Sequence, residues 1–228
     1  MVHDGGATRE HSVYTWLRRW AILCAHISCL LLTFATCYVA FGSRSGAGLF
    51  IWHPLLMSLA FSFFMTEAVL VFSPDASSLP GSPRPRRTCF HWLLQTFVVA
   101  CSLGGLVVII LHKEHQERPH FTTYHSWFGL AVVICTLLQA FCGPLVLYPK
   151  LLSQHFSLAR LKVYHATFGL ACYVLASTTL ALGLNSNWAR AQFPAFVRYC
   201  FITCPIICAL VVTNQVTNGY LMRKRMQM

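Results

Sequence analysis

Four histidines stand at the starts of four successive apolar stretches of this sequence: His53, His91, His125 and His165. Two of them belong to a repeated motif, which reads YHSWFGL from residue 124 and YHATFGL from residue 164. A neutral imidazole is a common metal ligand, and it can be buried in an apolar region without burying a charge. One histidine at the head of each stretch therefore indicates a repeated site for a metal-centred group.

The apolar stretches predict an all-α membrane protein. Hydrophobic residues make up 56% of the 228 residues and charged residues only 10%, and the mean hydropathy of +0.58 is too high for a soluble domain. Six runs have the roughly 20 residues that a bilayer-spanning helix needs: 19–41, 53–73, 89–111, 124–147, 163–184 and 195–220. The gaps are short, so we expect one compact bundle, with a polar segment over 1–15, a six-helix domain over 16–220 and a basic tail over 221–228.

The distribution of Lys and Arg predicts the orientation. Twelve of the 17 fall on the side that would hold both termini. Positive residues concentrate on the cytosolic side of membrane proteins, so both termini are expected in the cytosol. The formal net charge of +11 is thereby explained without a nucleic-acid partner. The 11 cysteines include no CxxC pair, which excludes zinc-finger and thioredoxin-type spacing.

The same topology sorts the four histidines into two layers. Successive helices run in opposite directions, so helices 2 and 4 start on the outer side and helices 3 and 5 start on the cytosolic side. His53 and His125 then form a facing pair in the outer layer, and His91 and His165 form one in the inner layer. Two imidazoles that face each other inside a bundle suit the two axial positions of haem iron.

Three further residues lie on the ligand faces of these helices. Gly129 and Gly169 each follow a motif histidine by four residues, one helical turn on. Without a side chain at that place, a flat macrocycle can lie against the helix. Gln95 follows His91 by four residues and is expected to serve as a hydrogen-bond donor near that ligand.

Two other functions remain open at this point. A zinc or proton transporter would need carboxylates or further histidines deep in the membrane, and Glu67 is the carboxylate within a predicted span. Glu67 follows His53 by fourteen residues, which is about 21 Å along a helix, so it is expected near the inner pair, where it could relay a proton. His26 has no evident partner and is interpreted as a satisfied core histidine. A membrane adaptor whose histidines bind nothing is the second alternative.

The four-histidine arrangement resembles the cytochrome b561 family of transmembrane electron carriers. The strings WHPLLMSLAFSFFMTEAVLVFSP, LYPKLL, LARLKVYHATFGL and NQVTNGYLMRKRMQM are similar to one branch of that family, from about residue 16 to the end. The resemblance implies that helices 2–5 form a four-helix bundle around two b-type haems. It also implies His53 and His125 as ligands of the outer haem and His91 and His165 as ligands of the cytosolic one.

The resemblance further implies an oxidoreductase. Such a protein passes electrons from cytosolic ascorbate to monodehydroascorbate or ferric iron chelates on the luminal or outer side. For this branch it implies a membrane of the endoplasmic reticulum or of cytoplasmic vesicles, and family members are often homodimeric.

Substrate contacts follow from charge and from the family pattern. An anionic donor needs cations beside the inner haem, and the candidates are Arg86, Arg87, Lys150, Arg160 and Lys162. The family places the acceptor above the outer haem, where the candidates are His112, Lys113, His120 and Tyr124.

One departure from the family concerns the donor site. Ascorbate-using members carry an arginine at the end of helix 2, whereas the matching stretch here reads AVLVFSPDA, with Ser73 at that place. A second family motif is retained as TYHSWFG, residues 123–129. We therefore expect a donor site that differs in part from the family pattern.

Overall fold

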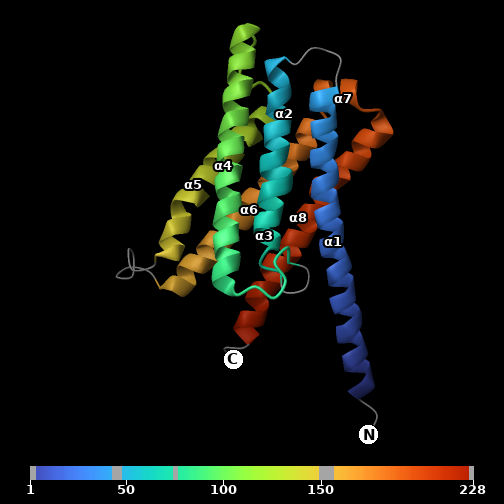
Figure 1. Cartoon of the computed structure of the whole chain (residues 1–228), viewed down its shortest axis with the longest axis vertical. Coiled ribbons are helices and arrows are strands. Elements are labelled where there is room, and N and C mark those ends of the chain that lie inside the picture. The colour runs from blue at the N-terminus through green and yellow to red at the C-terminus, as the bar shows by residue number, and fades with distance from the viewer. Residues whose placement is uncertain (1–3, 43–47, 74–76, 149–156, 226–228) are drawn as a thin grey trace.

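The computed structural model describes residues 4–42, 48–73, 77–148 and 157–225, and the regular elements in these ranges are all helical (Figure 1). The second span begins with a 3₁₀ turn, η1, and contains a π-helical segment, η2. In chain order the elements are α1 (Asp4–Gly42), η1 (Leu49–Ile51), α2 (Trp52–Met57), η2 (Ser58–Phe64), α3 (Met65–Leu70), α4 (Arg84–His115), α5 (Tyr124–Leu147), α6 (Leu158–Leu184), α7 (Asn187–Gln192) and α8 (Ala195–Arg225).

The six predicted spans are confirmed, although several helix ends differ. Six helical segments are long and apolar enough to cross a membrane. α1 begins at Asp4, so most of the predicted polar segment 1–15 belongs to the first helix. α4 begins at Arg84, where Pro83 acts as the N-cap residue and Pro85 occupies the first turn, a position that proline tolerates. The fifth gap contains the short helix α7.

The helices of spans 2 to 5 close into a ring of four. The segment α2–η2–α3 packs on α4, α4 on α5, α5 on α6, and α6 returns to η2. α1 and α8 pack on each other along one side of this ring, α8 against α6 and α1 against η2. Both marked chain ends lie at the same end of the bundle (Figure 1), as an even number of spans requires.

Apolar side chains fill the interior and also cover the outside. Ile22, Val98, Val132, Tyr173 and Val212 come from five different helices and belong to one buried cluster. Large apolar side chains on the outer faces are widely exposed, as a lipid-facing surface requires.

Candidate functional site: two facing histidine pairs

The outer pair consists of His53, in the first turn of α2, and His125, in the first turn of α5. Their ring centroids lie 6.2 Å apart with an angle of 88° between the ring planes. The Nδ1–H of His53 donates to the Gly105 carbonyl at 2.9 Å, and that of His125 donates to the Thr179 carbonyl at 3.0 Å. Each ring is thus oriented by the backbone of the neighbouring helix, α4 for His53 and α6 for His125.

The inner pair repeats this arrangement with His91 of α4 and His165 of α6. Their ring centroids lie 6.3 Å apart, with 77° between the planes. The Nδ1–H of His91 donates to the Ala68 carbonyl of α3 at 2.7 Å. The Nδ1 of His165 is buried and has no hydrogen-bond partner among the described residues. This nitrogen is the one polar ring atom of the two pairs that is left buried without a partner among those residues.

Both pairs have the spacing of two ligands on one metal. An imidazole nitrogen bonds a metal at about 2.0–2.1 Å and lies about 1.1 Å from its own ring centre, so two rings on opposite sides of a metal have centroids about 6.3 Å apart. The separations of 6.2 and 6.3 Å match this value. A carbonyl oxygen only accepts, so Nδ1 carries the proton in His53, His91 and His125, and Nε2 keeps the lone pair that a metal needs. The residues present therefore fit an iron held between two imidazoles.

Glycines near the pairs have distinct roles. A cavity of about 40 Å³ at the outer pair is lined by Gly129 together with both histidines. Gly169 instead faces Gln139, whose Nε2 would lie 2.8 Å from an added Cβ. This glycine thus makes room for Gln139, which donates to the His165 carbonyl at 2.7 Å.

Sequence reasoning missed Gln139, Gly183 and the carbonyl that orients His91. The Nδ1 of His91 donates to the Ala68 carbonyl, and the donor role of Gln95 stays a prediction. Gln139 was detectable as an isolated amide inside a long apolar run. Gly183 lies against the His125 ring, with 2.9 Å between an added Cβ and Cε1, and no local sequence pattern indicates that contact.

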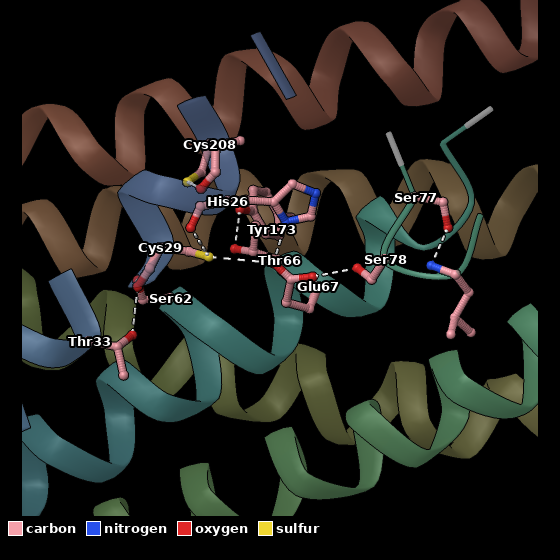
Figure 2. A network of polar contacts seen from close by, with 12 residues as sticks. His26, Cys29, Thr33, Ser62, Thr66, Glu67, Ser77, Ser78, Tyr173 and Cys208 are labelled. Carbon is pink, nitrogen blue, oxygen red and sulfur yellow. Dashed lines mark hydrogen bonds and ion pairs between the residues drawn. The ribbon is translucent and has the colours of Figure 1, made fainter. Parts of the chain in front are cut away.

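Glu67 does have a partner, and it is His26. The two lie 41 residues apart in sequence, and His26 Nδ1 lies 2.5 Å from Glu67 Oε1. The carboxylate also accepts from Ser78 Oγ at 2.7 Å, and Cys29 Sγ lies 3.6 Å from Glu67 Oε1. Figure 2 draws these contacts as dashed lines. Glu67 directly precedes Ala68, whose carbonyl orients His91, so this network lies at the level of the inner pair, where the sequence predicted it.

The four outer candidates do not converge on one site. The His112 ring lies 5.2 Å from that of Phe50, which in turn lies 6.2 Å from that of His53, so His112 borders the outer pair. Lys113 donates to the Pro119 carbonyl at 2.8 Å, and His120 pairs with Glu114 at 2.7 Å. Tyr124 is 78% exposed. Of these four residues, His112 is the one whose ring contacts Phe50, which in turn packs next to His53.

The candidates predicted for the donor site near the inner pair also differ from one another. The Arg87 Nε donates to the Ser82 carbonyl at 3.1 Å, and its Nη1 donates to the Ser73 carbonyl at 3.3 Å. Arg87 therefore brings a guanidinium to the position where the family resemblance expects an arginine and this chain has Ser73. Arg86 and Arg160 are exposed, Lys162 is half-buried, and Lys150 lies outside the described residues.

A closed metal-transport site is not found in the described ranges. No group of three or more His, Cys, Asp or Glu side chains there is placed to hold a metal ion. The histidines occur as pairs instead, and two protein ligands are enough for the iron of a haem, because the porphyrin supplies the other ligands.

Comparisons with known proteins agree with this geometry. A model of the eukaryotic cytochrome b561 family matches residues 52–190, which include all four histidines. The chain is 46% identical to the transmembrane reductase CYB561D2 of Homo sapiens over 97% of this chain and 98% of that protein. It is 38% identical to the probable transmembrane reductase CYB561D1 of Mus musculus over 96% and 94%. It is 28% identical to the lysosomal membrane ascorbate-dependent ferrireductase CYB561A3 of Mus musculus over 61% and 56%.

Proposed function

The chain belongs to the cytochrome b561 family of transmembrane proteins, and we propose that it is a reductase that carries electrons from cytosolic ascorbate to monodehydroascorbate or a ferric chelate on the opposite side. The single observation that carries this proposal is the presence of two histidine pairs, at 6.2 and 6.3 Å, on the four helices of one closed ring. His53 and His125 would hold one haem b, and His91 and His165 a second. Each haem, when bound, would supply reversible one-electron oxidation and reduction of its iron.

The protein's own contribution is to fix the ligands and to keep water out. Backbone carbonyls hold three of the four rings in one tautomer, and Gln139 secures the helix turn that carries His165. Between the two layers the buried interior includes apolar side chains such as Val98 and Val132. Rigid ligands in a dry interior favour electron transfer, because little around the site has to rearrange when the charge changes.

The donor proposal depends on cations at the inner end. Arg87 is held by two carbonyls beside Ser73, which leaves its positive charge without a carboxylate partner among the described residues. An ascorbate anion would gain charge-assisted hydrogen bonds there, with Arg86, Arg160, Lys162 and Lys150 adding to the local positive potential. The name of CYB561A3 of Mus musculus includes ascorbate dependence, which supports the same donor here.

The orientation and the acceptor belong to the same proposal. Both termini and the inner pair would face the cytosol, and His112 would border the acceptor above the outer pair. We place the protein in the endoplasmic reticulum or in vesicles, and a homodimer is the expected assembly.

Absorbance spectra of the detergent-purified protein test this function. We expect a b-type α band after dithionite, about half of it lost in His91→Ala and in His125→Ala, and reduction by ascorbate alone. His115→Ala, an exposed histidine outside both pairs, is the matched control and should keep the full band. A folded, haem-supplied protein without the band would refute the proposal, and a band that ascorbate fails to reduce would refute the donor.

A further inference from the structure

A buried arginine stands at the outer end of the bundle without an anionic partner. Arg198 lies in the first turn of α8 and is only 7% exposed. Its Nη1 donates to Asn185 Oδ1 at 2.6 Å, and its Nε is buried with no hydrogen-bond partner among the described residues. Its Cζ lies 4.7 Å from the Tyr199 ring centroid. Among the described residues, the side chain of this fully charged group thus contacts one amide oxygen and one aromatic face.

A second arginine converges on the same amide. Arg190, in the last turn of α7, donates from Nη2 to Asn185 Oδ1 at 3.2 Å and from Nε to the Asn185 carbonyl at 3.1 Å. Neither arginine forms an ion pair among the described residues, whose two ion pairs involve Glu67 and Glu114. Two like charges therefore share one neutral acceptor.

This cluster is short of negative charge on physical grounds. A guanidinium loses its hydration on burial, and a neutral amide with a cation–π contact returns only part of that loss. The second guanidinium repels the first, and the N-terminus of α8 adds a further positive partial charge. A buried charge without a partner is strongly destabilising, so an anion bound at this cluster would stabilise it.

The cluster lies next to the outer histidine pair. Asn185 follows Gly183 by two residues, and Gly183 lies against the His125 ring. Trp188 of α7 lies 5.8 Å from Phe50, and Phe50 lies 6.2 Å from His53, as measured between ring centroids. An anion held by the two arginines would therefore border the outer site.

We propose that Arg198 and Arg190, positioned by Asn185, form a carboxylate-binding site at the outer end. A planar guanidinium matches the two oxygens of a carboxylate, and Asn185 and Arg190 are exposed, so the site is open on one side. The carboxylate has two sources: a propionate of the haem held by His53 and His125, or a soluble carboxylate that enters from the outer side. The first source rests on the proposed function, and the second does not.

Arg198→Gln and Arg190→Gln in the full-length, haem-supplied protein test the site. Arg190 is exposed, so its variant is expected to fold even if Arg198→Gln is not tolerated. Arg118→Gln, an exposed arginine in the loop between α4 and α5, is the matched control. Two quantities are measured on each protein: the midpoint potentials by redox titration, and the affinity for citrate, a redox-inert tricarboxylate, by calorimetry.

The two sources give different results. If the site holds a propionate, the neutral variants shift one midpoint potential and leave the citrate affinity unchanged. If the site holds a soluble carboxylate, citrate binds about tenfold or more weakly to the variants, the loss expected for one charge-assisted contact, and the potentials stay in place. Variants that match Arg118→Gln in both quantities overturn the proposal. If the wild type bound no haem, the proposed function would be refuted. The carboxylate-binding site would then still be tested by the affinity of the variants for citrate.

Discussion

Replacing Gly183 with alanine should disable the outer histidine pair and spare the inner one. The added Cβ would lie 2.9 Å from Cε1 and 3.3 Å from Nδ1 of His125. Carbon atoms pack best at about 3.5–4.0 Å, so the ring has to move by roughly 0.6 Å or more. A metal–ligand distance tolerates only about 0.2 Å. The ring is also fixed to the Thr179 carbonyl at 3.0 Å, so it has little freedom to move aside.

We expect Gly183→Ala to lose about half of the reduced b-type α band. Overpacking of this kind also costs about 1–3 kcal/mol in the free energy of unfolding, which lowers the midpoint of thermal unfolding in detergent. Gly104→Ala is the control, because its Cβ would meet only Leu56 Cδ1, at 3.5 Å, an ordinary contact. The reasoning is refuted if Gly183→Ala keeps the full band, or if both variants lose haem equally.

Three other changes probe separate parts of the structure. Gln139→Leu removes the donor to the His165 carbonyl, so haem binding at the inner site should weaken and haem binding at the outer site should be unchanged. The measurement compares the reduced b-type α band and the redox titration of this variant with those of Gln139→Glu and the wild type. Tyr173→Phe leaves the buried Thr66 hydroxyl without its 2.7 Å partner and should lower the free energy of unfolding by about 1–3 kcal/mol, measured by thermal unfolding; an unchanged midpoint contradicts this. Arg87→Gln should raise the KM for ascorbate by about tenfold or more with the dithionite-reduced spectrum unchanged, and an unaltered KM removes Arg87 from the donor site.

Hydropathy and helix direction were sufficient to predict the spans and the histidine layers. Both depend on quantities that a linear sequence carries: the length of an apolar run and the alternation of direction between short gaps. His53 and His125 are 72 residues apart in sequence, and their proximity follows from topology alone. The pairing of His53 with His125 and of His91 with His165 could therefore be predicted without knowledge of side-chain packing.

Contacts made across helices could not be predicted in this way. The partnership of His26 with Glu67 depends on the rotation of the second span, which includes the π-helical segment η2. One residue inserted into a helix turns all later residues by about 100° about its axis. Glu67 follows η2 and contacts α1 through His26, whereas His53 precedes η2 and faces α4 and α5. A sequence reading that assumes 3.6 residues per turn throughout the span cannot predict that His53 and Glu67 face different helices.

The orienting partners of three rings are backbone carbonyls, those of Gly105, Ala68 and Thr179. A carbonyl oxygen is present whichever amino acid occupies the position, so point substitution cannot delete it. The ligand geometry is instead sensitive to changes that shift one helix against another, and a larger side chain at a packed position is one such change: a Cβ at Gly105 would lie 3.2 Å from Met57 Cε, and Ala68 is fully buried. The distances between the helix axes are therefore the quantity that sets the orientation of these three rings.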